Sequence, residues 1–268
     1  MTKKERGYLT ELYYFALSFF VYGFLGWCTE VAYAAAKQGK FVNRGFLNGP
    51  ICPVYGIGVG VVVQFLTPVE NNLVLLYISS TILVTVIEGI TGFLLEKIFH
   101  NKWWDYSEQP LNIGGYVCVL FSLIWGVFCV LIVKIIHPLI YKVLTMIPLV
   151  LGIVVMACLA VGLLADLYVT ASGILKMNRR LEAMEKIAAE LKDLSNKVGK
   201  NIYENVMEGM EFREEKKARI EELKVKYEEM AENRTKVGER LVKAFPKMQV
   251  RQHKEIFEEL RERVRRSK

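Results

Sequence analysis

The run LVLLYISSTILVTVIEGITGFLLEKIF, from Leu73 to Phe99, is 27 residues long and carries only three charged side chains. A helix needs about 20 predominantly apolar residues to cross the hydrocarbon core of a bilayer. This run exceeds that length. It therefore predicts a membrane protein.

Four further apolar runs lie on either side of it: Leu12 to Ala36, Ile51 to Leu66, Ile113 to Ile136 and Ile147 to Thr170. The first resembles a signal peptide at its ends, but it is longer than the usual apolar core of about 7–15 residues and is interpreted as a retained span. The second is short and rich in Pro and Gly, so it is either a short span or a re-entrant helix. The predicted fold is all-α: a polytopic membrane bundle of about five helices with a charged, coiled-coil-like C-terminal region.

The charges of the chain are concentrated in its last third. Residues 1–175 hold ten Lys and Arg and nine Asp and Glu, whereas residues 176–268 hold 25 and 19. This contrast predicts a transmembrane helical domain over residues 1–171 and a helical domain over residues 172–268.

Apolar residues in the charged region recur at alternating steps of three and four, the spacing of a coiled coil or a helical hairpin. Its positive surplus does not indicate nucleic-acid binding, because the signs alternate and few aromatic residues lie between them. Docking of a partner, or a homo-oligomer formed through these helices, is the better interpretation. Pro246 is expected to end the second helix and a short third one to follow. The first seam is Met177, Leu181, Met184, Ala188, Leu191 and Val198; the second is Ile220, Leu223, Tyr227, Met230, Val237 and Leu241.

The Lys and Arg residues beside the spans give conflicting evidence on orientation. Five spans with the charged region in the cytoplasm place the positive residues at 37–44 and 97–102 inside, but Lys3, Lys4 and Arg6 outside. If Ile51 to Leu66 is re-entrant and only four helices cross the membrane, the N-terminus lies inside and residues 37–44 lie outside. Both interpretations place the C-terminal region in the cytoplasm.

Carboxylates inside the spans point to function, because ionisable side chains at membrane depth are costly and tend to face protein or water. Glu88 and Glu96 share a polar stripe of the third span, and Glu30 lies on a glycine stripe of the first. If the two stripes pack together, the carboxylates converge, and the polar loops supply donors. The predicted binding residues are Glu30, Asn43, Arg44, Asn48, Glu88, Glu96, Asp105, Tyr106 and Asn112.

Some of these residues also have a purely structural interpretation. Glu96 can end a helix at the headgroups, and Asp166, near the end of its span, is interpreted as interfacial. A structural ion pair between Glu30 and Arg44 is a further alternative.

Several catalytic motifs are missing from the sequence. No G-x-x-x-x-G-K-[ST] occurs, so the chain carries no P-loop ATPase site of its own. The three His are far apart and the five Cys include no C-x-x-C pair, which gives no pattern for a metal site, a disulfide framework or a catalytic triad. We therefore predict no cofactor, and an enzymatic role is disfavoured.

Four blocks in a fixed order carry a resemblance: FLGWCTE (24–30), FVNRGFLNGPICPVYGIG (41–58), LLEKIFHNKWWDYS (94–107) and LNIGGYVC (111–118). Over residues 19–137 the chain resembles the bacterial membrane proteins of the putative ABC-transporter type IV, or CmpB-like, family. The resemblance implies a multi-pass protein of the bacterial plasma membrane, and a permease subunit whose ATPase is a separate chain. It names no substrate and transfers no catalytic residue.

Three functions remain open. The leading hypothesis is a transporter permease component with a polar cavity lined by carboxylates, Arg and Asn. The alternative is a membrane-embedded enzyme acting on a lipid or lipid-linked substrate, with Glu30 or Glu88 as general base and Arg44 binding a phosphate. The third is a scaffold that anchors the helical tail, which would need no buried carboxylates.

Overall fold

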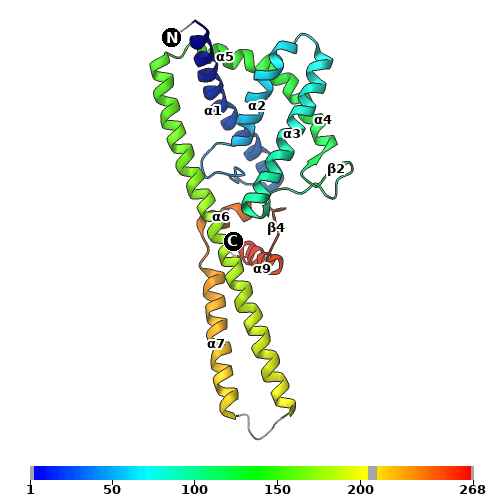
Figure 1. Cartoon of the computed structure of the whole chain (residues 1–268), viewed down its shortest axis with the longest axis vertical. Helices are drawn as coiled ribbons and strands as arrows, with labels where there is room; N and C mark the ends of the chain where they lie inside the picture. Colours follow the sequence, from blue (N-terminus) through cyan, green and yellow to red (C-terminus); the bar gives the residue numbers. More distant parts are fainter. Residues whose placement is uncertain (1–2, 205–209, 267–268) are drawn as a thin grey trace. The chain divides into compact units, whose positions relative to one another are not determined.

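The computed structural model describes residues 3–204 and 210–266, and those residues are almost entirely helical (Figure 1). The side chains of Lys3, Lys4 and Arg6 lie outside the described ones. The chain forms two compact units. The first comprises Met1–Thr170 and Ala244–Gln249, and the second comprises Ala171–Lys243 and Val250–Lys268.

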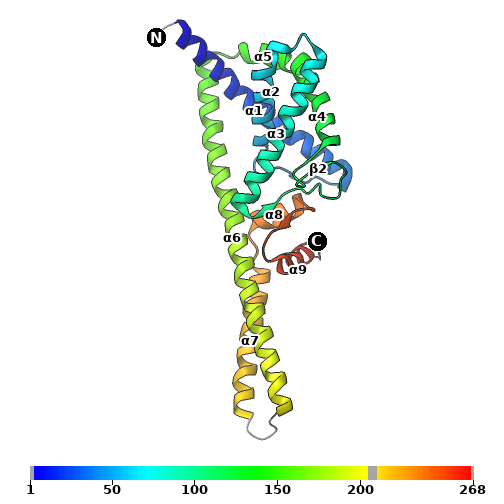
Figure 2. The same cartoon turned by 45° about the vertical axis from the view of Figure 1, so that its right-hand side comes forward.

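The first unit is a bundle of antiparallel helices. Its elements are α1 (Lys3–Gln38), α2 (Pro53–Leu66) with the 3-10 turn η1 (Thr67–Val69), α3 (Leu73–Phe99), α4 (Val119–Leu131), the π-helical turn η2 (Ile132–Ile136), α5 (His137–Thr145) and the first part of α6 (Leu149–Glu204). Helix α1 packs on α2, α2 on α3, and α3 on α4. Figures 1 and 2 show α2 between α1 and α3.

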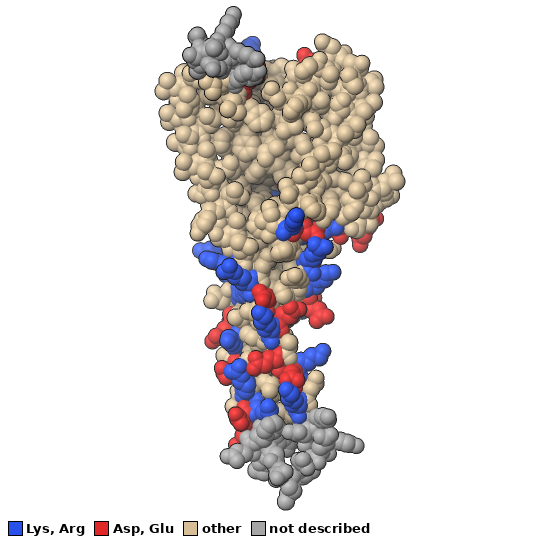
Figure 3. Space-filling view, viewed as in Figure 1, with Lys and Arg blue, Asp and Glu red and all other residues tan. Residues whose placement is uncertain are grey.

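Four helical stretches are long and apolar enough to cross a membrane: Leu9–Gln38, Leu73–Phe99, Val119–Thr145 and Leu149–Val198. Large apolar side chains on them are exposed, among them Ile82, Val127 and Leu164 at 60%, 60% and 64%. The face of this unit that Figure 3 shows carries few charged side chains. Surface of this kind belongs in lipid, so the all-α polytopic membrane bundle predicted from the sequence is confirmed.

Helix α2 approaches α1 closely because glycines line the contact. A Cβ built on Gly26 would lie 2.4 Å from the Cβ of Tyr55, and one on Gly56 would lie 2.6 Å from the main-chain oxygen of Phe19. Neither separation is possible for real atoms. Gly56 and Gly26 are therefore helix-packing residues.

The start of the fourth span differs from the one expected. The fourth span begins at Val119 instead of Ile113, because β2 (Asn112–Ile113) and β3 (Val117–Cys118) pair antiparallel as a hairpin. Its turn uses Gly114 and Gly115 at φ values of 60° and 72°, which glycine adopts readily. The other two strands, β1 (Asn101–Lys102) and β4 (Gln249–Val250), are equally short.

The second unit contains the remainder of α6, which continues from the first unit without a break, together with α7 (Met210–Glu232), α8 (Lys236–Ala244) and α9 (Lys254–Arg266). Helices α6 and α7 run side by side as a hairpin, and Arg219 Nη2 on α7 lies 3.1 Å from Glu190 Oε1 on α6. The second seam is interrupted at residues 233–235, so Val237 and Leu241 lie on α8. Lys, Arg, Asp and Glu alternate over its surface in Figure 3. Its buried residues include Leu181, Met184, Leu223, Leu241 and Phe257.

Candidate functional site

The segment of residues 39–52 turns back along α1 before α2 begins. Cys52 N donates a hydrogen bond to Gly23 O at 2.9 Å, fifteen residues before the end of α1 at Gln38. At 1.5 Å per residue, α2 therefore starts about 22 Å back from the end of α1. This returning segment carries three of the predicted binding residues, Asn43, Arg44 and Asn48.

The two asparagines hold the returning segment in place. Trp27 Nε1 donates to Asn43 Oδ1 at 2.7 Å, and Asn43 Nδ2 donates to Asn48 O at 2.7 Å. Asn48 Nδ2 in turn donates to Asp166 Oδ1 at 2.7 Å. These amides are used within the fold, so their first role is to fix Arg44.

Asp166 on α6 accepts hydrogen bonds at both oxygens. The main-chain N–H of Asn48 donates to Oδ1 at 3.1 Å, that of Gly49 to Oδ2 at 2.6 Å, and the hydroxyl of Thr170 to Oδ1 at 3.2 Å. The interpretation of Asp166 as an interfacial residue does not include this role in holding the returning segment. The signal available was Thr170, which follows at i+4 on the same helical face.

Arg44 forms an ion pair with Glu30 on α1. Its Nε lies 3.2 Å from Glu30 Oε2, and both side chains are about three-quarters buried, at 28% and 25% exposure. Glu30 Oε1 accepts a hydrogen bond from the hydroxyl of Tyr55 at 2.7 Å. The guanidinium also lies over the ring of Tyr33, at 4.8 Å.

Glu88 on α3 faces the loop between α3 and α4. Tyr106 Oη donates to Glu88 Oε1 at 3.3 Å, while the buried Oε2 of Glu88 has no hydrogen-bond partner among the described residues. A buried acceptor without a donor costs about 1–3 kcal/mol, so it is a place where a ligand can gain binding energy.

The pKa of the Tyr106 phenol responds to both carboxylates. Burial raises this pKa above the ordinary value of 10.0, the charges of Glu88 and Glu30 raise it further, and the charge of Arg44 lowers it. All three charged groups therefore lie within electrostatic reach of one hydroxyl. We call Glu30, Arg44, Glu88 and Tyr106 the polar cluster.

The polar cluster does not arise from direct packing of α1 on α3. The glycine stripe of α1 contacts α2 and the returning segment: a Cβ on Gly23 would lie 2.9 Å from Ile51 Cγ2. A Cβ on Gly92 of α3 would instead lie 3.0 Å from Tyr116 in the loop between α3 and α4. Glu30 pairs with Arg44 and Glu88 with Tyr106, and the second member of each pair comes from a loop.

The other predicted residues lie in separate contacts. Glu96 Oε2 accepts from Tyr116 Oη at 2.8 Å. Asn112 Nδ2 donates to the main-chain oxygen of Gln109 at 2.8 Å, within its own loop.

Asp105 is held beside the same loop. Its Oδ1 pairs with Lys102 Nζ at 2.8 Å and accepts from Ser107 Oγ at 2.6 Å. Burial alone would raise the pKa of Asp105, but these hydrogen bonds and the charge of Lys102 lower it to about 2. Asp105, like Asn112, shapes the loop that presents Tyr106.

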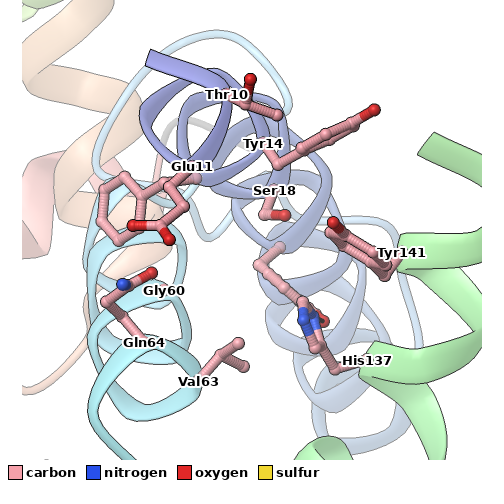
Figure 4. Close-up of a pocket in the computed structure, with 11 residues that line it drawn as sticks. Thr10, Glu11, Tyr14, Ser18, Gly60, Val63, Gln64, His137 and Tyr141 are labelled. Atoms are coloured by element: carbon pink, nitrogen blue, oxygen red, sulfur yellow. Dashed lines mark hydrogen bonds between the residues drawn. The ribbon is translucent and has the colours of Figure 1, made fainter. Parts of the chain in front are cut away.

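A pocket of about 130 Å³ lies elsewhere in the first unit, between α1, α2 and α5 (Figure 4). None of the nine predicted binding residues lines it. Its aromatic residues are spread over α1 and α5. No motif in the sequence indicates that they lie together. Within the described ranges, no three His, Cys, Asp or Glu side chains are gathered as metal ligands would be.

The comparisons with known proteins agree with the membrane architecture. The family model described as "Putative ABC-transporter type IV" matches residues 17–171, more than half of the chain. No curated protein and no solved structure matches this chain.

Proposed function

We propose, because the chain belongs to the family described as "Putative ABC-transporter type IV", that it is the permease component of a bacterial ABC transporter. The polar cluster is its solute-binding site. One observation carries this assignment: a buried carboxylate oxygen of Glu88 has no donor among the described residues, in a membrane unit where such groups are costly.

The chemistry of the cluster indicates the class of solute. Arg44 balances the charge of Glu30 through Nε, and no described residue hydrogen-bonds to its two terminal nitrogens. Those N–H groups suit a carboxylate or phosphoryl oxygen, and Glu88 suits an N–H or O–H donor. The expected solute is therefore small and polar, with a donor and an acceptor at opposite ends.

The driving ATPase is a separate chain in this proposal, because the sequence holds no P-loop motif. The spans α3, α4 and α6 alternate in direction, so the loop between α3 and α4 emerges on the same side as the end of the α6 span. Lys97, in the last turn of α3, and Lys102, within the loop, lie on that side. We assign this side to the cytoplasm of a bacterial plasma membrane by the positive-inside rule.

On that side, the loop of residues 100–118 becomes the coupling surface for the ATPase. Residues 172–268 become a cytoplasmic helical domain that binds a partner chain or a second copy. Transmission to the solute site has a direct route, because Tyr106 in the loop donates to Glu88 in the span.

The first test needs no known substrate. Purified protein in lipid nanodiscs is screened by thermal shift against polar metabolites of defined charge. A solute that raises the melting temperature of the wild type should fail to do so with Arg44→Ala and Glu88→Gln, and should still do so with Glu108→Gln, an exposed carboxylate of the loop. Stabilisation that survives both cluster variants would remove the cluster as the binding site.

The second test separates transport from lipid chemistry. Proteoliposomes containing the protein and its ATPase are loaded with ATP, and internal solutes and lipids are quantified by mass spectrometry. ATP-dependent movement of the stabilising solute, with an unchanged lipid profile, is expected. A converted lipid without solute movement would contradict the permease assignment and support the membrane enzyme.

A further inference from the structure

The pocket of Figure 4 lies far from the polar cluster. Its α1 residues run from Thr10 to Tyr22, whereas Glu30 belongs to the cluster. From Tyr14 to Glu30 the rise along α1 is about 24 Å. The pocket is therefore a second feature of the bundle, near the start of α1 and beside α5.

Five of the eleven residues that line it are aromatic. Tyr14 and Tyr141 have ring centroids 5.1 Å apart, and His137 lies 5.8 Å from Tyr141. Tyr22 is 6.2 Å from His137 by ring centroids, and Phe15 completes the lining on α1. The faces of Tyr and Phe rings carry partial negative charge, which attracts cations.

Besides Thr10 and the aromatic residues, three polar side chains line the pocket: Glu11, Ser18 and Gln64. Figure 4 shows Glu11 and Gln64 on one side and Tyr141 and His137 on the other. Within the described part of the chain, none of the three makes a side-chain hydrogen bond or ion pair, although Ser18 is only 5% exposed. By contrast, Tyr22 Oη and His137 Nδ1 satisfy each other at 2.9 Å.

We propose that this pocket binds a compact organic ammonium group. The aromatic walls hold the alkylated cation by cation–π attraction, and the Glu11 carboxylate balances its charge. A volume of about 130 Å³ suits a single trimethylammonium-sized group and not a drug-sized ligand, whose pockets begin at about 300 Å³. Ser18 and Gln64 supply oxygens for an N–H or O–H on the same group.

The ammonium group can come from a free solute or from the headgroup of a zwitterionic lipid. The chemistry of recognition is the same for both, and the experiment distinguishes them. The proposal does not depend on the permease assignment, because it concerns other residues and a binding readout that needs no ATPase.

The test uses radiolabelled choline with purified full-length protein in nanodiscs of phosphatidylglycerol, a lipid without an amine, and empty nanodiscs as background. Saturable binding to one site is expected. Tetramethylammonium should compete, whereas 3,3-dimethyl-1-butanol, the uncharged isostere of choline, should not.

Two variants and two matched controls locate the site. Glu11→Gln and Tyr141→Leu should each weaken choline binding at least about fivefold. Glu108→Gln and Tyr168→Leu, both at exposed positions of the first unit, should bind as the wild type does. Glu11 is itself exposed, so Glu11→Gln keeps the test valid if Tyr141→Leu does not fold.

The outcomes are separable. If phosphatidylcholine or phosphatidylethanolamine in the nanodisc abolishes choline binding, the occupant is a lipid headgroup. If binding is unchanged, the occupant is a free solute. No saturable binding in phosphatidylglycerol nanodiscs, equal competition by the uncharged isostere, or wild-type affinity in Glu11→Gln would overturn the proposal.

Discussion

Asn48 Nδ2 lies 2.7 Å from Asp166 Oδ1, although 118 positions separate the two residues in the chain. This contact, with the main-chain N–H groups of Asn48 and Gly49, attaches the returning segment to α6. Arg44 is thereby held on a segment that has no secondary structure of its own.

Asp166→Asn should lower the free energy of unfolding by about 2–3 kcal/mol. The substitution removes the negative charge and puts an amide opposite donors that need an acceptor. Thermal unfolding in detergent measures the change. Asp193→Asn is the control, since Asp193 pairs with Lys197 on an exposed helix face, 59% exposed, and should cost under about 0.5 kcal/mol. Equal losses in both variants would show that the Asp166 contacts are not stabilising.

The Glu30 and Arg44 substitutions should not be additive. Each single change, Glu30→Gln or Arg44→Ala, leaves a partly buried group without its partner, so the second change costs less than the first. A double-mutant cycle on thermal stability should give a coupling free energy of about 1–3 kcal/mol. Additive effects would mean that the 3.2 Å ion pair contributes nothing to the fold.

Gly26→Ala should destabilise the first unit by about 1–3 kcal/mol, because the new methyl group collides with Tyr55 and separates α1 from α2. The matched control is Gly162→Ala on α6, where nothing lies within 4 Å of the added Cβ. There the helix propensity of Ala should raise stability by up to about 1 kcal/mol. The two glycines should thus respond with opposite sign in the same unfolding assay.

The stabilisation by Asp105 should depend on pH. Its folded pKa, about 2, lies below the ordinary 3.8, so its contribution is complete above about pH 4 and is lost as the pH falls through 2. Because the pair with Lys102 is near the surface, we expect about 1 kcal/mol. The stability difference between wild type and Asp105→Asn should be present at pH 6 and shrink between pH 4 and pH 2. A difference that stays constant would contradict the depressed pKa.

Phe245→Ala should expose Trp103 to water. The two rings meet edge to face at 5.2 Å, and Trp103 is 4% exposed. Quenching of tryptophan fluorescence by acrylamide should increase in this variant. Phe65→Ala, at a position 68% exposed on α2, is the control and should leave quenching unchanged. Unaltered quenching in Phe245→Ala would show that the ring does not shield Trp103.

The spans could be predicted because lipid imposes length and apolarity on any crossing helix. Leu73 to Phe99 is helical over the predicted range. Hydropathy does not locate the start of the fourth span, because the apolar residues of segment 112–118 read as a continuation of the apolar helix that follows. Their hairpin depends on the turn formed by Gly114 and Gly115.

The polar cluster was less accessible to sequence reasoning. The cost of burying a carboxylate marks Glu30 and Glu88 in the sequence, and an ion pair of Glu30 with Arg44 is among its alternatives. The hydrogen bond from Tyr106 to Glu88 has no signal in the sequence, because it depends on how the loop folds against α3. Asp166 is interpreted as interfacial because it lies near the end of its span, whereas most of its donors come from residues 48 and 49, which only the tertiary fold brings to it. The sequence contains no signal for the aromatic pocket. Its aromatic residues come from α1 and α5, which are far apart in the chain, and aromatic residues are common at membrane interfaces.

The segment Ala244–Gln249 belongs to the first unit, although the 73 residues 171–243 of the second unit precede it in the chain. Trp103 and Asp105 must therefore wait for Phe245 and Gln249. Phe245 lies 142 residues after Trp103, and Gln249 lies 144 residues after Asp105. At a translation rate of about 5–20 residues per second, that delay is roughly 7–29 seconds. During this interval the ribosome carries a membrane bundle whose loop of residues 100–118 is still open to chaperones and to early-arriving partners.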